Sequence, residues 1–124
     1  MKLKTISLPE LNNLDPTLES TFIKMGEEQG ELAECIGKFR NLSGENNDLD
    51  EVDIIKKTAK ELMDVAQTCV TMMFKLEEQY GINLDEIRKE HIKKLEKRGY
   101  IKIWISKIYY LYIIKINNKD GIPK

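Results

Sequence analysis

Apolar side chains recur at three- and four-residue steps along three segments of the chain, and this periodicity constrains the fold more than any other feature. Such spacing is typical of amphipathic α-helices that bury one stripe of side chains. The three segments predict helices over residues 16–40, 51–79 and 83–99. A polar, turn-rich stretch at residues 41–48 separates the first two. The predicted fold class is therefore all-α, an antiparallel helical bundle.

Local signals mark where the helices begin and end. Asp15 and Pro16 indicate the first start, because Asp can cap a helix and Pro is tolerated at the first helical position. Gly81 is expected to end the second helix, and Asn83 to begin the third. The side chains expected to be buried are Leu18, Phe22, Met25, Gln29, Leu32, Ile36 and Phe39 on the first helix, and Ile55, Ala59, Leu62, Ala66, Cys69, Met73 and Leu76 on the second.

Composition limits the classes of function. The 124 residues suit one domain with a single modest core. The 20 basic and 21 acidic residues leave a net charge of −1, which gives no general attraction to nucleic acid or to an anionic membrane. No stretch reaches the roughly 18 apolar residues of a transmembrane segment. Cys35 and Cys69 are expected to be buried free thiols, which favours a reducing, cytoplasmic setting.

Acidic residues form a pair on each of the first two predicted helices. Glu28 and Glu31 are three residues apart, as are Glu61 and Asp64, so each pair shares a helix face. If the helices pack antiparallel, the four carboxylates converge, and their mutual repulsion requires a cation between them. Carboxylate ligands without nearby His or Cys select Mg²⁺ or Mn²⁺ over Zn²⁺.

The same spacing also has a plainer explanation. Acidic pairs three residues apart occur elsewhere in the chain, for example at Glu45 and Asp48 and at Asp50 and Asp53. A solvated acidic helix face produces such pairs without any metal. Spacing alone therefore leaves both a metal site and a solvated face open.

Three stretches of sequence resemble the MazG-like all-α nucleoside triphosphate pyrophosphohydrolases. They are EEQGEL at residues 27–32, KELMDVAQ at residues 60–67 and EHIKKLEKRGY at residues 90–100. The resemblance implies a helical pyrophosphohydrolase domain over residues 1–100 whose cofactor is Mg²⁺, with Mn²⁺ possible. It further implies that the metal ligands and catalytic residues are Glu28, Glu31, Glu61 and Asp64.

The resemblance also implies roles for residues around this set. Glu27 would have a supporting role, or simply lie on a solvated helix surface. Lys94 and Arg98 would bind substrate phosphates, or alternatively complement the end of the third helix. Family members often carry an Asn in that segment, which this chain lacks. His91 lies in line with apolar residues of the third helix and is expected to pack there.

The expected function follows from the resemblance. It is Mg²⁺-dependent cleavage of a ribo- or deoxyribonucleoside triphosphate to the monophosphate and pyrophosphate, as in sanitation of the nucleotide pool. The alternatives are a related phosphohydrolase acting on a phosphoribosyl-nucleotide and a non-catalytic helical interaction module. A homodimer or higher homo-oligomer is expected, because three helices bury their stripes poorly alone and a glycine-lined edge at Gly26 and Gly30 suits a close neighbour.

The resemblance ends before the tail, residues 101–124. Its first part, IKIWISKIYYLYIIKI, is rich in β-branched and aromatic residues, which favours a strand. Such a segment could pack on the bundle or on a second subunit, or contact a membrane surface. It could also be a frameshifted or read-through end of an AT-rich gene that was not selected as part of the fold, because Ile, Lys, Tyr and Asn all have AT-rich codons.

Overall fold

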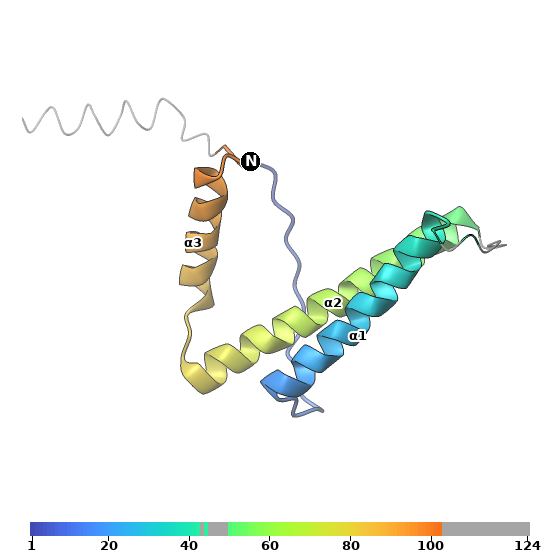
Figure 1. Cartoon of the computed structure of the whole chain (residues 1–124). Coiled ribbons are helices and arrows are strands. Elements are labelled where there is room, and N and C mark those ends of the chain that lie inside the picture. The colour runs from blue at the N-terminus through green and yellow to red at the C-terminus, as the bar shows by residue number, and fades with distance from the viewer. Residues whose placement is uncertain (43, 45–49, 103–124) are drawn as a thin grey trace, which may run out of the picture. The chain divides into compact units, whose positions relative to one another are not determined.

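The computed structural model describes residues 1–42, 44 and 50–102 and contains three helices (Figure 1). They are α1 (Leu18–Phe39), α2 (Glu51–Tyr80) and α3 (Leu84–Lys97). All regular secondary structure in these described ranges is helical, which confirms the all-α prediction. The chain divides into two compact units, Ile6–Leu84 and Met1–Thr5 with Asp85–Lys124. The strand prediction for the tail covers residues 101–116, of which residues 103–116 lie outside the described residues.

Helices α1 and α2 pack against each other as an antiparallel hairpin (Figure 1). The residues that face the partner helix repeat every seven positions, with alternating steps of three and four, as in helices that cross at a small angle. We call this contact the seam, and its members are buried or half-buried. The seam consists of Leu18, Thr21, Met25, Glu28, Leu32, Cys35 and Phe39 on α1 and Ile54, Thr58, Glu61, Val65, Thr68 and Met72 on α2.

The predicted buried stripes are therefore wrong at many positions. Phe22 is 67% exposed and Leu62 is 55% exposed, whereas Thr21 and Thr68 are buried in the seam. The physical reason is that the seam contains polar side chains at several of its positions, so a criterion of apolar periodicity favours the neighbouring, more apolar stripe. Together Phe22, Ile36, Ile55, Leu62 and Met73 form what we call the outer apolar face.

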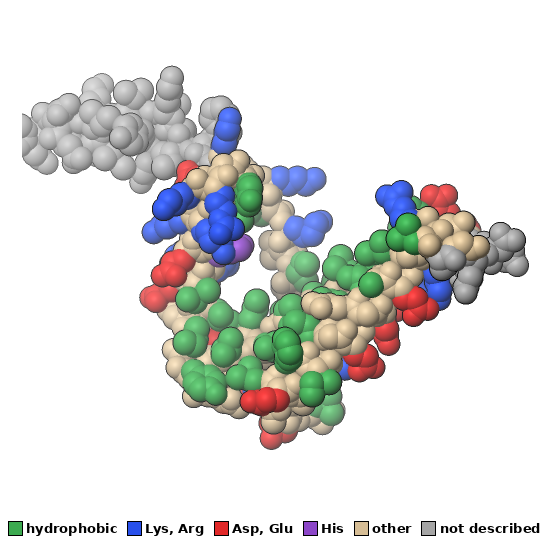
Figure 2. All heavy atoms as spheres, viewed as in Figure 1, with side chains coloured by type: hydrophobic (Ala, Val, Ile, Leu, Met, Phe, Trp, Pro, Cys, Tyr) green, Lys and Arg blue, Asp and Glu red, His purple; other side chains and the backbone are tan. Residues whose placement is uncertain are grey.

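The outer apolar face is one surface of the hairpin. Each of its members follows a seam position by one residue, which turns its side chain about 100° around the helix. Because α1 and α2 run antiparallel, the same turn points both sets to the same side of the hairpin. These side chains are between 44% and 67% exposed. Figure 2 shows hydrophobic side chains at the surface along the hairpin.

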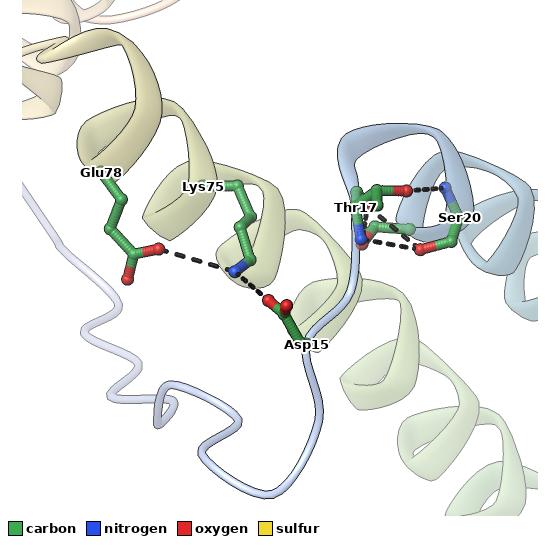
Figure 3. Close-up of polar contacts among 6 residues, drawn as sticks. Asp15, Thr17, Ser20, Lys75 and Glu78 are labelled. Atoms are coloured by element: carbon green, nitrogen blue, oxygen red, sulfur yellow. Dashed lines mark hydrogen bonds and ion pairs between the residues drawn. The ribbon is translucent and has the colours of Figure 1, made fainter.

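The start of α1 differs slightly from the prediction. Thr17, rather than Asp15, caps the helix, and it exchanges hydrogen bonds with Ser20 in a capping box (Figure 3). The Ser20 backbone N–H donates to the Thr17 hydroxyl at 3.0 Å, and the Thr17 backbone N–H donates to the Ser20 hydroxyl at 2.9 Å. Asp15 instead pairs with Lys75 of α2, at 3.2 Å.

The segment before α1 lies along α2. The Gln67 side-chain amide donates to the Pro9 carbonyl at 2.9 Å, and Lys75 lies between Asp15 and Glu78 (Figure 3). The Lys75 side chain is 15% exposed although it lies beyond the level at which α1 begins, so the segment before α1 covers this part of α2. This explains why α2 is more enclosed in its second half than in its first.

The remaining helix ends agree with the sequence signals. Asp50 caps α2, and Gly81 ends it with a positive φ of 63°, which favours glycine. Gly99 follows α3 with φ of 75°. Cys35 and Cys69 are free, the first buried and the second half-buried. None of the three described helices combines the length and the apolar composition that a bilayer span requires.

Candidate functional site

Three carboxylates meet where α1 and α2 face each other. Glu28, Glu31 and Glu61 each place one oxygen within 4.8 Å of the others. Glu28 is buried, Glu61 is half-buried and Glu31 is exposed. The group is therefore anchored in the seam and opens toward solvent at Glu31. We refer to these three residues as the carboxylate cluster.

The register of the hairpin explains this meeting. Glu28 and Glu61 are seam positions at the same level. Seven residues nearer the connecting loop, Cys35 of α1 and Ile54 of α2 line one small hollow together with Lys57, which gives the same register. Glu28 therefore lies within the seam itself, and a seven-residue repeat brings it opposite Glu61.

Asp64, the fourth predicted ligand, is exposed and lies outside the carboxylate cluster. Both Glu31 and Asp64 follow a seam position by three residues, so they point to the same face of the hairpin. Glu31 lies roughly 4.5 Å from the level of Glu28 and Glu61, toward the loop that connects α1 and α2. Because the helices run in opposite directions, Asp64 lies a similar distance from that level, away from the loop. The four carboxylates thus share one face but extend along it.

Like charge crowds the cluster. The charge of Glu28 first, then partial burial and the charge of Glu61, raise the pKa of the Glu31 carboxyl above its ordinary value. One cation offsets part of this charge, since Lys24 Nζ lies 2.7 Å from Glu28 and 3.3 Å from Glu27. Hydrogen bonds to Glu28 and Glu27 raise the pKa of Lys24. Glu31 and Glu61 keep a local excess of negative charge.

The other predicted residues are exposed. Glu27 pairs with Lys24 at the helix surface, with 57% of its side chain accessible. Lys94 and Arg98 belong to the unit that contains α3, whose surface carries many Lys and Arg side chains (Figure 2). His91 is also exposed, so the expectation that it packs with apolar neighbours on α3 is wrong for this structure. Ile87, an apolar residue in line with it on α3, is itself 49% exposed.

Sequence reasoning missed Lys24. It precedes Glu28 by four residues, a spacing that brings opposite charges together on one helix face, so the signal was available. The spacing of acidic pairs alone does not include the basic residue that neutralises one of them.

The arrangement suits a hard divalent cation. Carboxylate oxygens within 4.8 Å of one another, one of them on a buried side chain, repel each other unless a positive charge lies between them. Oxygen donors of this kind fit Mg²⁺ or Mn²⁺. Exposure on the Glu31 side leaves room for a ligand that brings its own oxygens.

A comparison with protein-family models identifies the chain's relationship. The model described as the MazG nucleotide pyrophosphohydrolase domain matches residues 16–100. The matched range contains all three described helices and every predicted site residue. Comparisons with curated proteins and with solved structures find no match.

Proposed function

Because the chain belongs to the MazG nucleotide pyrophosphohydrolase family, we propose that it cleaves nucleoside triphosphates to monophosphates and pyrophosphate with Mg²⁺ as cofactor. The observation that carries this proposal is the carboxylate cluster, which joins the two acidic helices inside the matched range. Mn²⁺ fits the same donors. A ribo- or deoxyribonucleoside triphosphate is the proposed substrate, and nucleotide pool sanitation the proposed role.

The proposal gives each carboxylate a task. Glu28, Glu31 and Glu61 would hold the metal, and Asp64, on the same face of the hairpin, would complete the set. When bound, the ion would bind phosphate oxygens and offset the charge that develops on them. One of the four carboxylates orients a water and accepts its proton as the water attacks the α-phosphorus. Glu27 supports this group from the adjoining surface.

Basic residues of the third matched segment are the proposed phosphate ligands. Lys94 and Arg98 are exposed and four residues apart, so they occupy one side of α3 and its end. A triphosphate needs cationic partners beyond the metal, because its own charge exceeds that of one divalent ion. These two residues would supply them.

The products test the proposed chemistry. Attack at the α-phosphorus leaves monophosphate and pyrophosphate, whereas attack at the γ-phosphorus leaves diphosphate and phosphate. We expect the first pair when the protein is incubated with Mg²⁺ and a panel of common and modified triphosphates, with products separated by anion exchange. Diphosphate as main product would contradict the assignment. Absence of turnover across triphosphates and phosphoribosyl-nucleotides would favour a non-catalytic module.

Exposed apolar surface supports a homo-oligomer. Cys35 and Ile54 are the only buried apolar residues in the part of the chain that the structure describes. The outer apolar face stays open, and Ile23 on α1 is 72% exposed. Apolar surface of this extent on a small domain is typical of an interface. We propose a homodimer that covers these side chains, as in a four-helix core.

Gly30 offers a test of this assembly. No atom lies within 4 Å of the Cβ that would be added there, so a single chain accommodates a larger side chain. Gly30→Leu should therefore shift the protein toward monomer or aggregate in size-exclusion chromatography with light scattering, because it obstructs the neighbour and not the protomer. In a lone chain Gly30→Ala should instead stabilise α1 by about 1 kcal/mol. A wild-type protein that stays monomeric at every concentration would rule out the dimer.

The proposed location is the cytoplasm. Cys35 and Cys69 are both free thiols, as expected for a protein kept in a reducing compartment. Nucleoside triphosphates, the proposed substrates, would be available there.

A further inference from the structure

Lys24 occupies a special position at the carboxylate cluster. Its ammonium lies 2.7 Å from Glu28, whose side chain is only 9% exposed, while the Lys24 side chain itself is 52% exposed. The lysine therefore reaches from solvent to a carboxylate that is almost entirely enclosed. An ammonium at this distance forms a charge-assisted hydrogen bond to a Glu28 oxygen and occupies space next to it.

The contact is a competitor for any cation that binds the cluster. A divalent ion that uses a Glu28 oxygen needs the same negative charge that Lys24 neutralises. If Lys24 stays in place, its positive charge repels the ion. If it leaves, the 2.7 Å contact is lost. Either outcome lowers the affinity of the free protein for the ion.

We propose that Lys24 is a built-in counter-cation of the metal site, which neutralises Glu28 in the metal-free protein and lowers its affinity for divalent ions. This inference rests on the proposed function, since it assumes that the cluster binds metal. Lys24 thus acts through Glu28 as a positioning residue. In the metal-free state it offsets part of the repulsion within the carboxylate cluster.

Loss of the Lys24 charge should change both the melting temperature of the metal-free protein and the affinity for a divalent ion, in opposite directions. Removing the charge should lower the melting temperature of the metal-free protein, because Glu28 loses its partner. The same change should raise the affinity for a divalent ion, because the competitor is gone. A lysine that only stabilises the helix would change the first quantity and not the second.

Lys38 provides a matched control. It lies on α1 as well and forms an ion pair of the same spacing and length with Glu34, at 2.7 Å. Glu34 is no member of the carboxylate cluster, and Lys38 lies 14 positions beyond Lys24. Lys38→Met therefore removes the same charge from the same helix without removing a contact to the cluster.

The experiment is isothermal titration calorimetry of the full chain with MnCl₂, without nucleotide, at neutral pH and low ionic strength. We expect Lys24→Met to bind Mn²⁺ about three- to tenfold more tightly than wild type. The ion then no longer has to displace a partly exposed ion pair, and Lys24 no longer repels it. Lys24→Gln, a polar second variant, should do the same. Lys24→Arg, which keeps the charge, and Lys38→Met should stay within about twofold of wild type.

Two results would overturn the inference, and they differ. If wild type binds Mn²⁺ and both Lys24→Met and Lys24→Gln bind it equally or more weakly, Lys24 is no competitor and the metal site remains. If wild type and all variants fail to bind Mn²⁺, the proposed metal site falls together with the inference.

Discussion

Replacing Glu61 by Gln is expected to lower the rate of triphosphate hydrolysis at least about a hundredfold, with Mg²⁺ present and helicity unchanged. Glu61 is half-buried and places an oxygen within 4.8 Å of oxygens of Glu28 and Glu31. The amide has nearly the same shape and helix propensity but carries no charge for a metal. The measurements are pyrophosphate release and far-ultraviolet circular dichroism.

The metal-free Glu61→Gln protein should not be less stable than wild type. The carboxylates of the cluster repel one another. The charge of Glu28 is the largest cause of the raised pKa of Glu31, and the charge of Glu61 adds to it. Removing one charge relieves that repulsion, so loss of activity should come with an equal or higher melting temperature. A variant that loses activity because it unfolds would show the opposite change.

Glu34→Gln is the matched control for this experiment. Glu34 is a glutamate of α1 that pairs with Lys38 at the surface and does not belong to the carboxylate cluster. It should keep its activity. Asp64→Asn then tests the fourth ligand, since it should resemble Glu61→Gln if Asp64 holds metal and Glu34→Gln if it does not. A fully active Glu61→Gln protein would restore the solvated acidic face.

The helices themselves were predictable because their signals are local. Gly81 ends α2 with a positive φ, and the start at Asn83 is confirmed by α3, which begins at Leu84. The start of α1 was misplaced by two residues, because Asp15 has a distant partner. The pairing of Asp15 with Lys75 joins residues 60 positions apart, which no local rule detects.

Apolar periodicity predicted the seam only in part: Leu18, Met25, Leu32 and Phe39 lie in it as expected, but none of the positions expected on α2 does. Both helices carry two adjacent stripes, and the more apolar one contains Phe22 and Leu62, which are exposed in the single chain. The stripe that packs contains Thr21, Glu28 and Thr68, all buried. A search for hydrophobic residues selects the wrong stripe whenever the packed one holds polar side chains.

The candidate site was predictable in part, because spacing along one helix is a local feature and the register between two helices is not. Equal spacing of two acidic pairs indicated that they share a face, and the structure brings three of the four together. The level of Glu28 and Glu61 depends on the register of the hairpin, which is set by side chains along its whole length. The neutralising role of Lys24 depends on burial of Glu28, which the sequence does not show.

The second large effect is expected at Ile54, and it tests the seam directly. Ile54 is 8% exposed, whereas its neighbour Ile55 is 50% exposed. Ile54→Ala should lower the free energy of unfolding by about 2 kcal/mol or more, because it removes buried methyl groups and leaves a cavity. Urea denaturation followed by circular dichroism measures this change. If Ile54→Ala and Ile55→Ala lowered the free energy of unfolding equally at low protein concentration, the assigned seam would be contradicted.

Ile55→Ala is the control, and it also reports on assembly. Both substitutions change the helix propensity of α2 by the same amount, so the difference between them isolates burial. In a lone hairpin Ile55→Ala should cost well under about 1 kcal/mol, since half of the side chain already contacts water. If a second copy covers the outer apolar face, the cost of Ile55→Ala should grow as protein concentration rises, because the substitution then weakens association as well as folding. The cost of Ile54→Ala, which acts within one hairpin, should be present at every concentration.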